Sequence, residues 1–293
     1  MGQHRSNPAI TYLKHPQDFE SPEDLVRDYA HYLLKEAGAY RLPIRLAAIS
    51  RYFNFPVHYR QLPQEDRGCI TDDLRIYLNA ADRLTVQQFT LAHEFMEVLF
   101  FALKEGAADD WMSDPLFEAL QKRKEALCDA GAAELLMPLP LFRAFVSQSP
   151  ISLQWAQEIA AYCKLSLMAI LRRIVETGLS PIALVIWRYK HSPKEFVPSM
   201  IGQGNLLGSM EEMDPPKKMR VDRWFISPSL QCYIPRDKSV PLTSSIYQAF
   251  VEGVATADFE EIDLVGIQGR YFIESLPYNV TGERQVLSLI HLG

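Results

Sequence analysis

The chain has 293 residues, of which 48% are hydrophobic, and a formal net charge of −6 at pH 7. At roughly 100–200 residues per domain, this length allows two or three domains with buried cores, and we expect a soluble, globular protein. The negative charge disfavours whole-surface attraction to nucleic acid or an anionic membrane, but leaves a local basic patch open. No apolar run approaches the ~18 residues of a membrane span, and the four cysteines form no CxxC pair. We therefore expect reduced thiols and a cytoplasmic location.

Two helices are expected in the first sixth of the chain. Ser21, followed by Pro22 and two acidic residues, is typical of a helix start, and Gly38 is typical of a helix end. A second, shorter helix is expected within residues 42–55. Alternating apolar residues in the following segments, up to residue 79, predict a small sheet.

A longer helix is predicted from Thr85 to Gly106. Thr85 and Gln88 have the spacing of a capping box, and no helix breaker interrupts the apolar run that follows. Apolar side chains occupy both sides of this helix, so it should be buried nearly all round. A further helix is predicted from Asp114 to Met137, where prolines should close the first compact unit near residue 150.

Residues 151–178 predict two short helices with a break around 164–166, the outline of a helix-turn-helix. Their net charge is only 3 − 2 = +1, whereas a DNA-reading helix usually has a stronger basic footprint. DNA contact, a helical connector between domains and recognition of a repressor all stay open for this segment.

Residues 181–293 contain aromatic and β-branched runs that predict strands, with one helix near residues 244–255. We expect a separate α+β domain there. The Pro, Gly and Ser-rich stretch 192–216 is predicted to be a linker.

The long helix carries His93-Glu94-x-x-Glu97. Residues four apart share a helix face, so His93 and Glu97 can direct two donor atoms at one ion, while Glu94 can reach a water molecule. Burying an imidazole and two carboxylates among apolar neighbours is costly unless these groups are paired or bound to a metal. The tetrad alone is weak evidence, since short motifs recur by chance and a lone histidine is more often a satisfied core residue.

The next helix strengthens the metal interpretation. Glu125 and Asp129 are also four residues apart, so Glu125 can complete a three-ligand site. Asp129 is then placed to accept the remaining N–H of His93, as a carboxylate that orients a metal-bound imidazole. The alternative is that both acids are exposed helix charges paired with Lys122 or Lys124.

The segments QQFTLAHEF and EALCDAGAAELLMP resemble the two signature blocks of the IrrE/ImmA metallopeptidases, in matching order and at comparable separation. The resemblance implies an α+β multidomain chain. Residues 1–150 would form a zincin-like metallopeptidase domain, 151–180 a helix-turn-helix-like segment, and 181–293 a GAF-like sensor domain. By position it assigns His93, Glu97 and Glu125 as metal ligands and Glu94 as the catalytic residue.

Family members cleave a helix-turn-helix repressor and so induce genes, for example those of a DNA-damage response. The resemblance therefore implies a metallo-endopeptidase with such a repressor as substrate and a small-molecule ligand for the last domain. In peptidases of this architecture an edge strand beside the active-site helix can bind the substrate, and residues 70–79 are the candidate strand. The interpretation as an internal strand is equally open.

The chain departs from the family at Glu97, where the motif has its second histidine. Two carboxylate ligands would cancel the charge of a divalent ion and weaken its pull on a bound water molecule. Oxygen-rich ligation also favours harder ions, so zinc is expected first and manganese second. The alternative hypothesis is a non-catalytic pseudo-peptidase that regulates transcription by binding a repressor or DNA.

Overall fold

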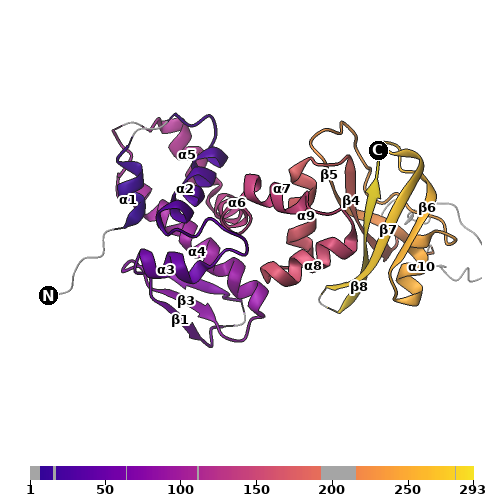
Figure 1. The fold of residues 1–293 in the computed structure, drawn as a ribbon, viewed down its shortest axis with the longest axis horizontal. Coiled ribbons are helices and arrows are strands. Elements are labelled where there is room, and N and C mark those ends of the chain that lie inside the picture. The colour runs from indigo at the N-terminus through magenta and orange to yellow at the C-terminus, as the bar shows by residue number, and fades with distance from the viewer. Residues whose placement is uncertain (1–6, 16–17, 64, 111, 193–215, 281) are drawn as a thin grey trace, which may run out of the picture. The chain divides into compact units, whose positions relative to one another are not determined.

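The computed structural model describes residues 7–15, 18–63, 65–110, 112–192, 216–280 and 282–293. The chain folds into two compact units, one of residues 1–148 and 157–173 and the other of 149–156 and 174–293 (Figure 1). Within the described ranges, no helix is long and apolar enough to cross a membrane.

The first unit contains most of the helices. They are α1 (Pro8–Leu13), α2 (Pro22–Glu36), α3 (Leu46–Tyr52), α4 (Leu84–Lys104), α5 (Asp114–Lys122), α6 (Lys124–Leu136) and α7 (Leu139–Val146). Helix α2 begins and ends as predicted, since the Ser21 side chain accepts a hydrogen bond from the backbone N–H of Asp24 and Gly38 has a left-handed φ of 59°.

Helix α4 lies at the centre of this unit, packed against α1, α2, α6 and two strands. Both of its faces are buried, as predicted, with Phe95, Met96 and Leu99 each 0% exposed. The predicted capping box is wrong. The helix begins one residue earlier, its N-cap is Arg83, and no side chain makes a capping hydrogen bond. Packing of the apolar faces therefore stabilises α4, rather than a local cap.

The single helix predicted for 114–137 is two helices, α5 and α6. Arg123 leaves the helical conformation between them, at φ −115° and ψ 16°, and its guanidinium group lies 2.5 Å from the Glu23 carboxylate of α2. The predicted helix stop is confirmed, because α6 ends at Leu136, and the first stretch of the unit ends at residue 148. Helix α7 still fits between these points, because a proline in the first turn of a helix needs no N–H donor and Pro140 can occupy that turn.

A three-stranded sheet packs against α4. Its strands β1 (Val57–Arg60), β2 (Gly68–Ile70) and β3 (Ile76–Asn79) have the order β1-β3-β2, with β1 parallel and β2 antiparallel to β3. Of the two interpretations of residues 70–79, the internal strand holds for 76–79, because β3 is paired on both sides. The edge position next to α4 belongs to β2, which packs directly on that helix.

The predicted pair of short helices is confirmed as α8 (Leu153–Cys163) and α9 (Leu167–Thr177). Lys164 makes the break with a left-handed φ of 56°. The part of α9 that belongs to the first unit is anchored by Arg173, which is only 5% exposed. Its Nε donates to the Met137 carbonyl at 2.8 Å, and its guanidinium group pairs with Glu134.

The second unit is built on an antiparallel sheet. Its elements are β4 (Ile182–Lys190), β5 (Lys218–Ile226), α10 (Ser245–Glu252), β6 (Thr256–Asp263), β7 (Gln268–Val280) and β8 (Glu283–His291). The strand order is β5-β4-β8-β7-β6, and Trp187 on β4 lies fully buried in the core. The predicted helix and strands are confirmed here, and β6 is an addition. Most of the predicted linker, residues 193–215, lies outside the described residues.

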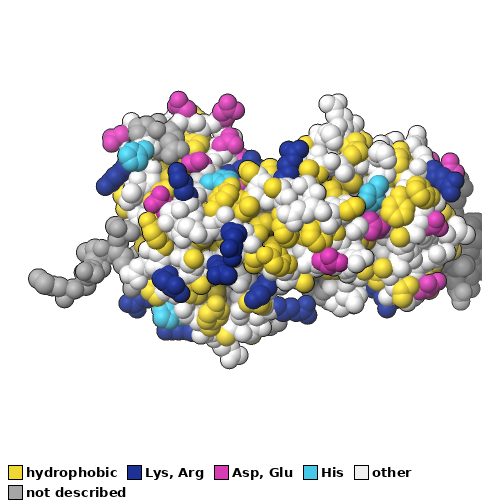
Figure 2. Space-filling view, viewed as in Figure 1, with side chains coloured by type: hydrophobic (Ala, Val, Ile, Leu, Met, Phe, Trp, Pro, Cys, Tyr) yellow, Lys and Arg dark blue, Asp and Glu magenta, His cyan; other side chains and the backbone are white. Residues whose placement is uncertain are grey.

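The first unit also carries a local basic surface. Figure 2 shows Lys and Arg side chains gathered on the part of this unit that bears β1 and β3. The exposed arginines of residues 41–83 are Arg41, Arg45, Arg51, Arg60, Arg67, Arg75 and Arg83.

Candidate metal and peptidase site

Helices α4 and α6 pack against each other and bring the candidate site residues together. The four-residue spacing on α6 produces two neighbouring rows of side chains. Asp129 and Glu125 face His93 of α4, whereas Lys124 and Cys128 face Glu97 one helical turn further on. A motif on one helix is therefore completed by a second helix some thirty residues later in the chain.

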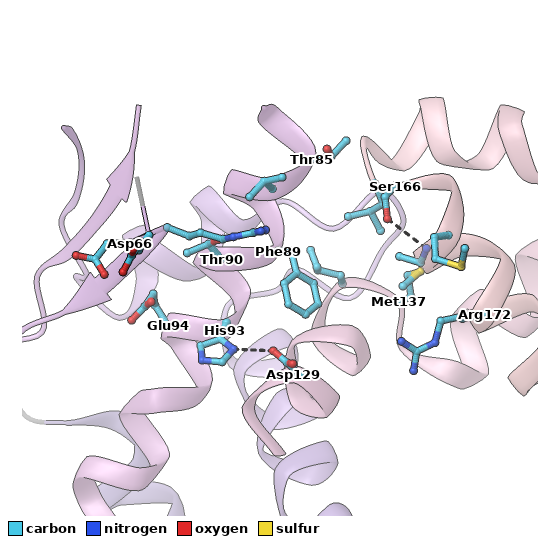
Figure 3. Close-up of a pocket in the computed structure, with 18 residues that line it drawn as sticks. Asp66, Thr85, Phe89, Thr90, His93, Glu94, Asp129, Met137, Ser166 and Arg172 are labelled. Atoms are coloured by element: carbon cyan, nitrogen blue, oxygen red, sulfur yellow. Dashed lines mark hydrogen bonds and ion pairs between the residues drawn. The ribbon is translucent and has the colours of Figure 1, made fainter. Parts of the chain in front are cut away.

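His93 makes the contact that the sequence predicted for it. Its Nδ1 lies 2.9 Å from Oδ1 of Asp129, a contact drawn as a dashed line in Figure 3, and its Nε2 lies 3.6 Å from Oε2 of Glu125. Burial alone would lower the pKa of the imidazole, but the hydrogen bond to Asp129 and the other nearby carboxylates raise it to about 10. The surrounding carboxylates thus favour a positive charge at this position.

Glu97 is held from three sides. Its Oε1 lies 3.7 Å from His93 Nε2 and 3.7 Å from Cys128 Sγ, while its Oε2 lies 2.5 Å from Lys124 Nζ. Burial alone would raise the pKa of Glu97, but hydrogen bonds from His93 and Lys124 lower it below the ordinary value. The side chains of Glu125 and Asp129 are exposed, at 78% and 60%, as the alternative expected, but Lys124 pairs with Glu97.

Glu94 lies beside these groups and lines a cavity. Glu94 is 6% exposed. Burial raises the pKa of its carboxyl group to about 7, although the nearby charge of His93 opposes part of this shift. A carboxyl group with a pKa near neutrality can both accept and release a proton at physiological pH.

The donor atoms fit a divalent cation. Ligands bound tetrahedrally at about 2.0–2.2 Å from zinc lie roughly 3.3–3.6 Å from one another. The distances from His93 Nε2 to Glu97 Oε1 and to Glu125 Oε2 are 3.7 and 3.6 Å, close to these values. The ligand atoms that all lie within 4.8 Å of one another belong to His93, Glu97 and Cys128, whereas Glu125, whose side chain is 78% exposed, approaches His93 without joining this group. The site thus offers nitrogen, oxygen and sulfur donors.

Sequence reasoning did not find Cys128 or Lys124 as members of the site. The cysteines form no CxxC pair, and the spacing of Lys124 predicts Glu125 or Asp129 as its partner. The signal that would have found them is the spacing itself, because Lys124 and Cys128 are four residues apart, like Glu125 and Asp129. Only the angle between α4 and α6 determines which of these rows faces which ligand.

A cavity of about 650 Å³ opens beside the candidate site and lies wholly within the first unit. Figure 3 shows His93, Glu94 and Asp129 on one side of it and residues of the α8–α9 region on the other. Its apolar lining includes Val86, Phe89, Leu136, Met137, Leu165 and Met168. The helix-turn-helix-like segment therefore supplies a wall of the cavity.

Comparison with known proteins gives matches to a family model and to solved structures. The model of the IrrE N-terminal-like domain, a peptidase family, matches residues 51–175. A solved structure described as a Mycobacterium tuberculosis transcriptional regulator is similar in fold, with a TM-score of 0.57 at 14% sequence identity, covering 97% of this chain and 80% of that chain. No curated protein sequence matches the chain.

Proposed function

We propose that this chain is a metal-dependent endopeptidase that acts in transcription control, because residues 51–175 match the model of the IrrE N-terminal-like domain. His93, Glu97 and Glu125 would hold the ion, with zinc first and manganese second in order of preference. The observation that carries the proposal is the approach of Glu97 and Glu125 to the same His93 nitrogen, next to Glu94 at the wall of a cavity. When bound, the ion supplies the Lewis acidity needed to hydrolyse a peptide carbonyl.

The chain's own residues have separate tasks in this proposal. Glu94, with a pKa of about 7, takes a proton from the attacking water and later passes it to the leaving amine. Asp129 accepts a hydrogen bond from Nδ1 of His93, which fixes the ring and directs Nε2 toward Glu97 and Glu125.

The substrate backbone would bind along the free edge of β2. The carbonyl of Arg67 accepts from Asn79 and the N–H of Thr71 donates to Arg75, so the odd-numbered residues of this segment point toward β3. By alternation, Gly68 and Ile70 direct their N–H and carbonyl groups away from the sheet, on the strand next to α4. An extended peptide can pair with this edge, with its side chains reaching the apolar cavity.

A helix-turn-helix repressor is the proposed substrate, and its cleavage would induce a stress response such as that to DNA damage. The resemblance of the two signature blocks supports this substrate class, and the fold similarity to a transcriptional regulator is consistent with it. The second unit would be a GAF-like sensor of a small molecule. We assign α9 to the cavity wall rather than to DNA reading, because Arg173 is buried.

The test is the substitution Glu94→Gln in the full chain. We expect zinc content and the unfolding midpoint to stay unchanged, while cleavage of the repressor encoded nearest to this gene falls by at least about a hundredfold, since proton transfer is lost. Glu105→Gln, at the exposed end of the same helix, is the matched control. Equal cleavage by Glu94→Gln and wild type would contradict the role of Glu94.

The competing function is regulation of transcription by a protein that keeps the peptidase fold but does not cleave peptide bonds. The observation in its favour is Glu97, which replaces a neutral nitrogen ligand by a carboxylate paired with a cation. Elemental analysis of wild type and Glu97→His separates the two functions. If wild type contains no metal and only Glu97→His acquires zinc, the enzymatic proposal is wrong.

A further inference from the structure

Lys124 occupies a specific place beside the candidate metal site. Its ammonium group lies 2.5 Å from Oε2 of Glu97, and its side chain is 33% exposed while that of Glu97 is 10% exposed. The other oxygen, Oε1, lies on the side of His93 Nε2 and Cys128 Sγ. One oxygen of the Glu97 carboxylate is thus held by the Lys124 ammonium group, and the other remains available as a metal ligand.

The charge of this pair matters for the chemistry. A carboxylate ligand adds one negative charge where an imidazole would add none, and it can bind an ion through two oxygens instead of one. The ammonium group of Lys124 cancels that charge and blocks the second oxygen. Together Glu97 and Lys124 therefore have the net charge and the single donor atom of a neutral imidazole.

We propose that Lys124 is the positioning residue that lets Glu97 replace a histidine ligand, by holding Oε2 and leaving Oε1 as a single donor. The proposal rests on the proposed metal-dependent function and deepens it. In this proposal the positive charge of Lys124 cancels the negative charge of Glu97. The pair therefore does not reduce the ion's pull on a bound water molecule in the way that an additional free carboxylate would.

X-ray absorption at the zinc edge tests the proposal on the full chain loaded with zinc. In Lys124→Met the second oxygen of Glu97 becomes available, so we expect one additional oxygen neighbour and a longer mean zinc–ligand distance. We also expect zinc to bind more tightly by roughly tenfold in competition with a chelator, because a nearby positive charge is removed. Lys124→Arg, which keeps the charge, should give the wild-type spectrum.

Two controls make the result specific. Lys122→Met makes the same chemical change at an exposed position two residues earlier and should leave the spectrum unchanged. In a Glu97→His background, Lys124→Met should also leave the spectrum unchanged, since no carboxylate is present to bind through a second oxygen.

The outcomes separate this proposal from the proposed function. If wild type binds zinc and Lys124→Met has the same zinc neighbours and affinity, the role of Lys124 is wrong while the metal site stands. If wild type binds no zinc, whether or not Lys124→Met acquires it, both the site and the role of Lys124 are overturned.

Discussion

Glu134 is a buried carboxylate of α6 that joins three parts of the first unit. It is 3% exposed, and its Oε1 accepts hydrogen bonds from the Leu139 backbone N–H and His31 Nε2, each at 2.9 Å. The guanidinium group of Arg173 on α9 pairs with its other oxygen. Burial alone would raise the pKa of Glu134, but His31 and Arg173 lower it to about 2.

This shift predicts acid sensitivity of the fold. Above about pH 4.5 the carboxyl group is ionised in folded and unfolded chains, and its contacts contribute fully to stability. As the pH falls toward about 2, the unfolded chain binds the proton first, so a contribution on the order of 3 kcal/mol is progressively lost. Urea unfolding between pH 5.5 and pH 3 should show the difference between wild type and Glu134→Gln shrinking with acidification.

The control for this prediction is Glu118→Gln, which removes an exposed carboxylate from α5. It should leave both the stability and its pH dependence close to those of wild type. A stability difference between wild type and Glu134→Gln that stays constant over this pH range would show that the contacts do not depend on the charge of Glu134.

At the residue scale, the sequence predicted several contacts of the site correctly. The spacing of His93 with Glu97 and of Glu125 with Asp129 places these side chains on single helix faces, and the structure brings Asp129 to His93. The contact between Lys124 and Glu97 was not predictable. Lys124 has several acidic neighbours within reach, and local spacing does not determine which of them it binds.

At the scale of elements, the close packing of β2 on α4 determines how the sheet lies beside the site. A Cβ atom added at Gly68 would lie 2.5 Å from Cγ2 of Thr90 and 3.0 Å from the carbonyl oxygen of Tyr77. No side chain fits between this strand and the helix without a shift. Gly68 therefore lets the proposed substrate-binding edge approach the helix that carries His93 and Glu94.

We predict that Gly68→Ala destabilises the fold by about 1–3 kcal/mol, because it overpacks a buried contact. The double variant Gly68→Ala with Thr90→Ser should recover part of this loss, since serine keeps the hydroxyl group but lacks Cγ2, while the contact with the Tyr77 carbonyl oxygen remains. Thermal and urea unfolding of the two single variants and the double variant measure the effect. Additive losses in the double variant would contradict the proposed contact.

Prediction of the elements succeeded where the signal is local and failed where it is not. The cap at Ser21 and the left-handed glycine at position 38 fix the ends of α2 within a few residues. The break at Arg123 depends on a partner in α2, a hundred residues earlier. The central position of β3 depends on which strands pair, and alternation of apolar residues carries no information on that.

At the scale of the whole molecule, the two compact units are interleaved along the chain. Residues 149–156 belong to the second unit, whereas 157–173 return to the first, so each of α8 and α9 is divided between them. The first unit thus gains part of its cavity wall and Arg173 from a segment that follows the predicted end of the peptidase domain.

This arrangement predicts the effect of truncation. A fragment that ends at residue 148 lacks Arg173 and leaves Glu134 buried without this cationic partner, a loss of about 3–5 kcal/mol for a broken buried pair. It should unfold at a clearly lower temperature than a fragment that ends at residue 177. Arg173→Met in the longer fragment should reproduce much of the loss. Equal unfolding temperatures for the two fragments would contradict the assignment of α9 to the first unit.

The family resemblance, the helix that carries His93 and Glu94, and the second helix with Glu125 and Asp129 are all readable from the order of residues along the chain. These features depend on residue spacing along one helix, which is a local property. The contact of Lys124 with Glu97, the edge position of β2 beside the site, and the place of α9 in the cavity wall emerge only in the folded chain. Each of these results depends on the angle and register between elements distant in sequence, which packing of the whole core sets.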